Sequence, residues 1–78
     1  MDKAKIKKVL LENIEFWGAK EKAKEAEAHE YLKKGNINRY NRAFEDSCRY
    51  MSMENALALL GEELEIFTEE EYEEIMGF

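Results

Sequence analysis

Apolar residues recur every three or four positions through the first part of the chain, which is the spacing of a buried helix face. This apolar arc comprises Ile6, Val9, Leu10, Ile14, Phe16 and Trp17. It then thins to alanines, which allow a neighbouring helix to approach closely, and recovers at Tyr31 and Leu32. The pattern predicts a helix over residues 2–34. Gly18 costs a helix about 1 kcal/mol relative to alanine, so one continuous helix is the favoured interpretation and a break at Gly18 is the alternative.

The segment "KKGNIN" predicts a tight connection to a second helix. Its two lysines suit the negative end of the first helix, Gly35 suits the left-handed position just beyond that end, and Asn36 can cap the next helix. A connection this short makes the two helices antiparallel neighbours.

An apolar stripe predicts the second helix, over residues 37–60, with Gly61 ending it. The stripe comprises Ile37, Tyr40, Phe44, Cys48 and Met51. After Ser52 the apolar set changes phase to Met53, Ala56, Leu57 and Leu60. Either Ser52 marks a kink, or the helix is apolar on two sides there and is buried against two neighbours at once.

The last eighteen residues carry eight glutamates and no basic side chain, yet they have the signals of a folded helix. Thr68 and Glu71 match a capping box, and Phe67 with Tyr72 matches a hydrophobic staple. The pattern predicts a linker over residues 61–67, pinned by Leu64 and Ile66, and a short helix over residues 69–76. The expected fold is therefore all-α, an antiparallel hairpin of two long helices plus a short C-terminal helix.

The composition is compatible with one small helical domain. The chain has 78 residues, no proline and one cysteine, which excludes an intramolecular disulfide. No stretch approaches the roughly 20 apolar residues that span a bilayer, and the N-terminus lacks the apolar run of a secretory signal. These features lead us to expect a cytoplasmic protein.

The sequence offers little support for catalysis or for a cofactor. His29 is the only histidine, and Cys48 lies on an apolar stripe, which favours an inert core thiol. The Glu-x-x-His motif of helical-bundle metal sites is absent, because position 26 is alanine. The glycines are isolated and form no phosphate-binding loop. We therefore expect a protein that is not an enzyme and that binds no metal or cofactor.

Charge is distributed unevenly along the chain, which suggests two alternative partners. Residues 1–49 hold all 12 basic residues and 9 acidic ones, whereas residues 50–78 hold 9 acidic residues and no basic one. The lysines at positions 3, 5, 7 and 8 could bind nucleic acid, but the glutamates among the later lysines and the net charge of −6 disfavour contact with phosphate.

The acidic segment could instead imitate a phosphate backbone and occupy the basic groove of another protein. Small acidic inhibitors carried by phages and mobile elements act in this way, an analogy of size and charge only. The candidate acidic surface comprises Glu62, Glu63, Glu65, Glu69, Glu70, Glu73 and Glu74. The competing interpretation is that these residues are the solvated face of a folded helix.

The apolar surface of the two long helices exceeds what one hairpin can cover, since a hairpin buries a single seam. Pairing two hairpins into a four-helix bundle would remove this deficit. The residues expected in the self-interface are Phe16, Trp17, Tyr40, Phe44, Met51 and Leu57. The leading hypothesis is a homodimeric protein–protein interaction module that acts by binding another macromolecule.

Overall fold

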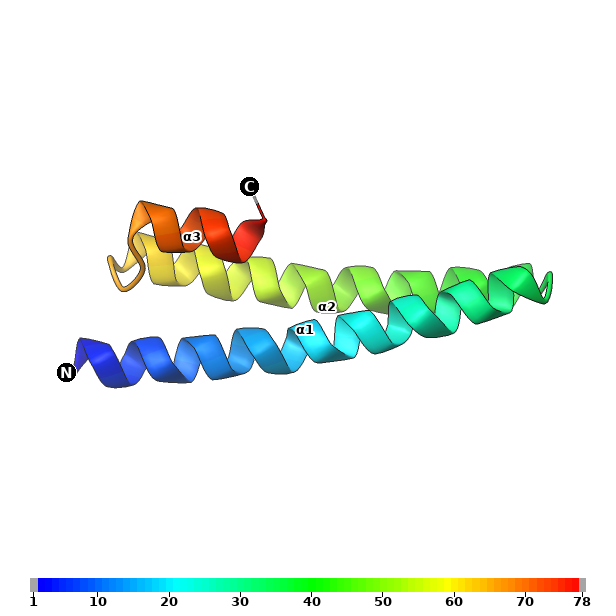
Figure 1. The fold of residues 1–78 in the computed structure, drawn as a ribbon, viewed down its shortest axis with the longest axis horizontal. Helices are drawn as coiled ribbons and strands as arrows, with labels where there is room; N and C mark the ends of the chain where they lie inside the picture. The colour runs from blue at the N-terminus through cyan, green and yellow to red at the C-terminus, as the bar shows by residue number, and fades with distance from the viewer. Residues whose placement is uncertain (1, 78) are drawn as a thin grey trace.

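The computed structural model describes residues 2–77 and consists of three helices, α1 (Lys3–Lys33), α2 (Ile37–Glu63) and α3 (Glu69–Met76). Figure 1 shows α1 and α2 side by side and antiparallel, with α3 folded back along α2 at the end where the N-terminus lies. We call this end of the hairpin the base, and the end with the turn between α1 and α2 the tip. The expected all-α helical hairpin with a short C-terminal helix is confirmed.

The hairpin is a thin rod with dimensions of 50 × 21 × 13 Å. Its radius of gyration of 15.1 Å exceeds the roughly 11.5 Å expected for a compact domain of this length. The smallest dimension is close to the diameter of a single helix, about 10–12 Å. Away from α3, the protein therefore has only two helices and one seam between them.

Local signals set the ends of the long helices. The Asp2 carboxylate accepts a hydrogen bond from the Ala4 N–H at the start of α1, and the Asn36 side chain accepts one from the Arg39 N–H at the start of α2. Gly35 has a φ of 73°, the left-handed conformation that glycine adopts without strain. Helix α1 runs unbroken through Gly18.

Small side chains line the seam between α1 and α2. Ala28 and Ala43 are each only 3% exposed, Ala58 is fully buried, and Ser47 is buried among them. The apolar stripe of α2 does not face α1 for most of its length, since Ile37, Phe44 and Met51 are exposed. The row of small residues occupies the seam because it lets the two helix backbones approach closely, and the larger side chains lie on the flanks.

Helix α2 continues beyond Gly61, contrary to the expectation that this glycine ends it. Gly61 is buried within the helix, and the ring of Phe67 packs against it where any side chain would lie. Its carbonyl oxygen also accepts hydrogen bonds from the N–H groups of Ile66 and Phe67, at 2.8 and 3.1 Å. Phe67 therefore anchors the linker together with the half-buried Ile66, whereas Leu64 is exposed and does not.

The predicted capping box of α3 is present. The Thr68 hydroxyl accepts a hydrogen bond from the Glu71 N–H at 3.1 Å, and the Glu71 carboxylate accepts one from the Thr68 N–H at 3.0 Å. This helix closes the main core at the base. That core comprises Leu10, Ile14, Ala58 and Phe67, with Ile6, Leu57, Ile66, Tyr72, Ile75 and Met76 packed around them. Among the helices described here, none is long and apolar enough to cross a membrane.

The contact between Gly61 and Phe67 predicts an unusual response to alanine. Alanine for glycine inside a helix normally stabilises by up to about 1 kcal/mol, but a Cβ at position 61 would overlap the ring of Phe67. Gly61→Ala should therefore lower the free energy of unfolding by about 1–3 kcal/mol, as measured by urea denaturation followed by circular dichroism.

Gly18→Ala is the matched control, because Gly18 is also inside a long helix. A Cβ there would lie 3.1 Å from the end of the flexible Glu54 side chain, which can move aside. This variant should keep or raise the free energy of unfolding, and an equal loss in both variants would contradict the packing role of Gly61.

Candidate interaction surface

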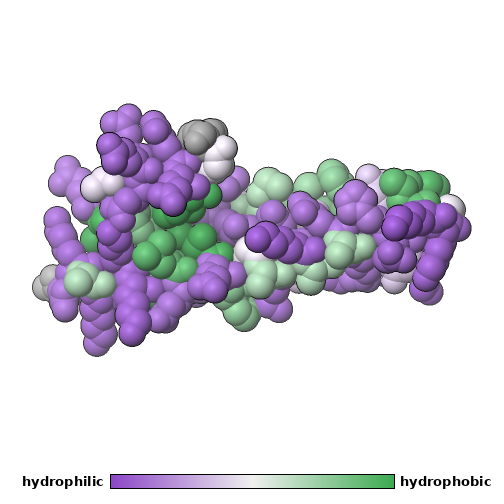
Figure 2. Space-filling model, in the orientation of Figure 1, coloured by the Kyte–Doolittle hydropathy of each residue, from purple (hydrophilic) through white to green (hydrophobic). Residues whose placement is uncertain are grey.

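Large apolar side chains remain exposed on a protein of only 78 residues. Figure 2 shows hydrophobic side chains gathered at the base, around α3, and again at the tip. Eleven large apolar residues in the described part of the chain are 40–54% exposed. They are Val9, Leu11, Phe16, Leu32, Ile37, Phe44, Met51, Met53, Leu59, Leu60 and Leu64. Apolar side chains that form a contiguous exposed surface indicate an interaction site.

One exposed surface lies on the side of the hairpin away from α3. Lys7 and Leu11 of α1 face α3, since Lys7 pairs with Glu71 and Leu11 lines a depression together with Ile75. Ile6 and Val9 lie on the opposite flank of α1, where they line an apolar depression with Lys5 and Leu10. We call this surface the Phe16 face. Its exposed apolar members are Val9, Phe16, Met53, Leu60 and Leu64.

An aromatic cluster lies at the middle of the Phe16 face. The Phe16 ring packs edge-on against Trp17, with ring centroids 5.1 Å apart, and Trp17 stacks on Tyr50 of α2 at 5.7 Å. The Lys20 ammonium lies over the rings of both Phe16 and Tyr50. These contacts join α1 and α2 on this flank, and Met53, Leu57, Leu60 and Leu64 continue it from Tyr50 toward the base at helical spacing.

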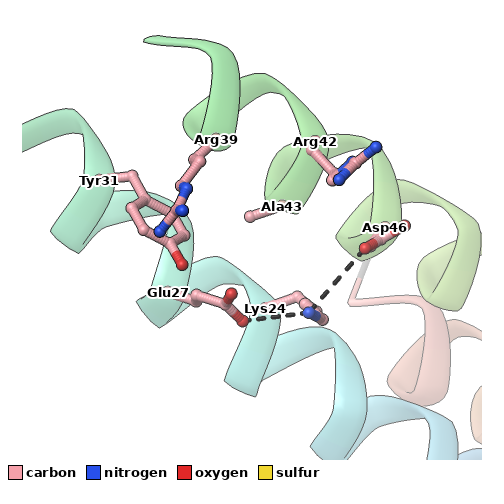
Figure 3. Close-up of a pocket in the computed structure, with 7 residues that line it drawn as sticks. All are labelled: Lys24, Glu27, Tyr31, Arg39, Arg42, Ala43 and Asp46. Carbon is pink, nitrogen blue, oxygen red and sulfur yellow. Dashed lines mark hydrogen bonds and ion pairs between the residues drawn. The ribbon is translucent and has the colours of Figure 1, made fainter. Parts of the chain in front are cut away.

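The tip half of the same flank is charged. An open depression of about 280 Å³ lies between α1 and α2, and Figure 3 shows the side chains that line it. Its lining residues are Lys24, Glu27, Tyr31, Arg39, Arg42, Ala43 and Asp46. Lys24 pairs with Glu27 at 3.1 Å and reaches Asp46 at 3.9 Å. Within residues 2–77, neither Arg39 nor Arg42 forms an ion pair, although Arg39 lies over the Tyr31 ring.

A second exposed surface lies on the α3 side of the hairpin, in its tip half. Ile37, Phe44, Met51 and Ala58 follow each other at intervals of seven residues and form one row on α2. Ala58 is fully buried in the core that α3 closes, whereas the other three are exposed. Helix α3 has eight residues, about 12 Å, so it ends before it can cover the whole row. We call the uncovered residues the Phe44 stripe, which comprises Ile37, Tyr40, Phe44, Cys48 and Met51.

The six residues expected in one self-interface lie on two opposite sides of the hairpin. Phe16 and Trp17 belong to the Phe16 face, while Tyr40, Phe44 and Met51 belong to the Phe44 stripe beyond the end of α3. Leu57 lies in the row that continues the Phe16 face, but it is half-buried and also packs against the core at the base. The sequence did not single out Val9, Met53, Leu60 and Leu64 as surface residues. For Met53 and Leu60 the change of phase after Ser52 was the signal, since α2 is apolar on two sides there and α3 covers only one.

The acidic segment lies beside the basic N-terminus. Of its seven candidate glutamates, six are exposed and Glu62 is half-buried. Lys7 forms an ion pair and hydrogen bond with Glu71, which is the largest cause of the lowered pKa of Glu71. The hydrogen bond that Glu71 accepts from the Thr68 N–H lowers this pKa further. The lysines at positions 3, 5, 7 and 8 all lie at the base. Charges of both signs therefore meet at this end, where residues 2–12 and 61–77 together carry ten acidic and four basic side chains.

The two residues considered for nucleophilic chemistry are both exposed. Cys48 was expected to be an inert core thiol, and this is wrong because its row lies on the flank of the seam. His29 lines a depression on the α3 side together with Glu25, Ala28, Tyr40 and Phe44. No group of three or more His, Cys, Asp or Glu side chains placed to hold a metal ion occurs within residues 2–77.

One glutamate in the seam, Glu54, lies where burial disfavours its negative charge. The Glu54 carboxylate lies against Gly18, and its Oε1 atom is buried without a hydrogen-bond partner among the described residues. Burial raises the pKa of Glu54 to about 7, and a hydrogen bond with Glu21 and the negative charge of Glu21 add to this effect. Near neutral pH, therefore, Glu54 keeps its proton in part of the folded molecules, unlike an exposed glutamate.

Comparison with protein-family models, curated protein sequences and solved structures yields no match for this chain.

The raised pKa of Glu54 predicts that part of the stability is lost as pH rises. The unfolded chain releases the proton near pH 4.5 and the folded protein near pH 7, so the folded state loses stability between these values. Glu54→Gln should therefore have a free energy of unfolding about 1 kcal/mol higher than that of wild type at pH 8. This gain is smaller than the pKa difference alone would give, because water screens the half-buried side chain. The advantage should shrink toward pH 4.5 in denaturation curves.

The control is Glu45→Gln, which removes the same charge from an exposed position of the same helix. Its effect on stability should be small at both pH values. An advantage of Glu54→Gln that does not vary with pH would contradict the raised pKa of Glu54.

Proposed function

We propose that this protein is a small interaction module without enzymatic activity, which forms a homodimer and acts by binding another macromolecule. The observation that carries the proposal is the pair of exposed apolar surfaces, the Phe16 face and the Phe44 stripe. They lie on opposite sides of the hairpin, so one surface can hold a second copy while the other stays open. Aromatic and methionine side chains, which both surfaces contain, are enriched in the buried parts of protein interfaces.

The exposed area supports self-association. The chain exposes 5985 Å², whereas a folded monomer of 9.2 kDa exposes about 4,900 Å². The excess of about 1,000 Å² is comparable to the roughly 800 Å² that each partner contributes to a standard protein interface. A dimer would return the exposed area per chain to the ordinary range.

Acidic mimicry of a phosphate backbone is a second candidate function, favoured by the excess of acidic residues at the base. This candidate is weakened because Glu69, Glu70 and Glu71 stabilise the first turn of α3, whose N-terminus carries a partial positive charge. That role explains these glutamates without a partner. Nucleic-acid binding has less support, because the N-terminal lysines lie at the same acidic end.

Light scattering coupled to gel filtration tests self-association. We expect a mass of twice the 9.2 kDa of one chain at micromolar protein concentrations, because burial of the apolar surface favours association. A mass of one chain at several hundred micromolar, together with a cooperative thermal transition, would overturn the dimer.

Capture from the native cell extract tests the binding of a macromolecule and separates the two candidates. Partners held by the Phe44 stripe should be retained at 0.5 M salt and lost with Phe44→Glu, because apolar contacts are not screened by ions. Partners held by the acidic surface should be released by salt and by the triple change of Glu65, Glu73 and Glu74 to Gln. Retention that depends on neither change would contradict both proposals.

A further inference from the structure

We propose that the second copy docks on the Phe16 face and that the two hairpins lie parallel, tip beside tip, with α1 of each copy over α2 of the other. This inference rests on the proposed dimer and assigns its surface and orientation. Three observations carry it: the unbroken extent of the face, its change from apolar to charged along the rod, and the complementary charges at both ends.

The Phe16 face is the longer of the two apolar surfaces. It runs from Ile6 and Leu64 at the base to the aromatic cluster near the middle of the rod and includes side chains from both long helices. The Phe44 stripe, in contrast, comes from α2 alone and is limited on one side by α3. An interface the size of the excess exposed area requires two helices from each copy, which the Phe16 face provides.

The change from apolar to charged along the Phe16 face selects the orientation. Two hairpins can meet face to face with full overlap in a parallel or an antiparallel manner. The antiparallel arrangement would place Arg39, Arg42 and Asp46 of one copy against Val9, Phe16 and Met53 of the other, which removes charges from water without pairing them. The parallel arrangement places apolar base against apolar base and charged tip against charged tip.

The charges in the parallel arrangement are complementary, because a two-fold axis along the rod places α1 of one copy over α2 of the other. Glu27 of α1 lies at the same level as Arg39 and Arg42 of α2, since all three line one depression. Glu27 of each copy would therefore meet the arginines of the other. At the base, Lys5 in the first turns of α1 would meet Glu63, the last residue of α2.

Every neighbouring pair of helices in this dimer would be antiparallel, as in the common up-and-down four-helix bundle. The two Phe44 stripes and the two α3 helices would lie on opposite outer sides. The dimer would thus offer two identical apolar sites to its target, which would bind with avidity if it carried two matching segments.

The chain contains a matched pair of variants that tests the surface. Phe16 and Phe44 are 54% and 51% exposed, and both lie inside long helices. Phe16→Glu should raise the dimer Kd at least about 30-fold, as expected for a residue central to an interface, whereas Phe44→Glu should leave the dimer intact. Leu60→Lys provides a second change on the Phe16 face, and circular dichroism confirms that each variant is folded.

Spin labels test the orientation. A nitroxide attached to Lys33→Cys, in a chain that carries Cys48→Ser, marks the exposed tip. The parallel dimer should give one label–label distance below about 30 Å, because neighbouring helices lie 8–10 Å apart. An antiparallel dimer with full overlap would place the labels near opposite ends of the rod, which is 50 Å long.

The outcomes separate this inference from the proposed dimer itself. Dissociation by Phe44→Glu but not by Phe16→Glu or Leu60→Lys would overturn the surface assignment and leave the dimer standing. A long label–label distance in a dimer that Phe16→Glu disrupts would overturn the parallel orientation. A wild-type protein that remains monomeric would overturn the proposed dimer and this inference together.

Discussion

The close approach of α1 and α2 along a seam of small residues is the constraint on which the rest of the structure depends. Ala28, Ala43, Ser47 and Ala58 are buried between the helices, and large side chains would hold the backbones apart. The larger apolar residues therefore lie on the two flanks of the seam. A pair of helices faces solvent on both flanks, so only a third layer can bury these residues, and the chain supplies that layer only as α3.

The contact of Phe67 with Gly61 determines which flank α3 covers. The missing side chain at Gly61 leaves space on α2 for the Phe67 ring, which brings the chain back along one flank toward the tip. The capping box at Thr68 then starts a helix immediately, but this helix is too short to pass the middle of the rod. One flank is consequently open along its whole length and the other is open only beyond α3, which gives the two apolar surfaces different lengths and different surroundings.

The seam is not uniformly apolar, and its polar residues affect the energetics. Glu54 lies near Glu21 between the helices, and its burial together with the nearby negative charge favours the protonated form of Glu54. The tip half of the seam carries Lys24 and Asp46, which form an ion pair across it. The apolar contribution to holding α1 against α2 is thus concentrated at the base, where the core formed with α3 is also found. Exposed apolar surface near that core is the surface most able to strengthen the fold when a partner covers it.

The sequence by itself determined the three helices, the turn at Gly35 and the capping box at Thr68, because these features depend on hydrogen bonds and backbone angles within a few residues of each other. It also indicated an excess of apolar surface. Only the tertiary structure decided which side of α2 faces α1. Helical periodicity locates an apolar row but does not say what covers it, and where a helix carries two rows, close packing favours the one with smaller side chains. For the same reason Cys48 lies outside the core, and Gly61, which resembles a helix terminator, is instead the site where a ring six residues later is buried.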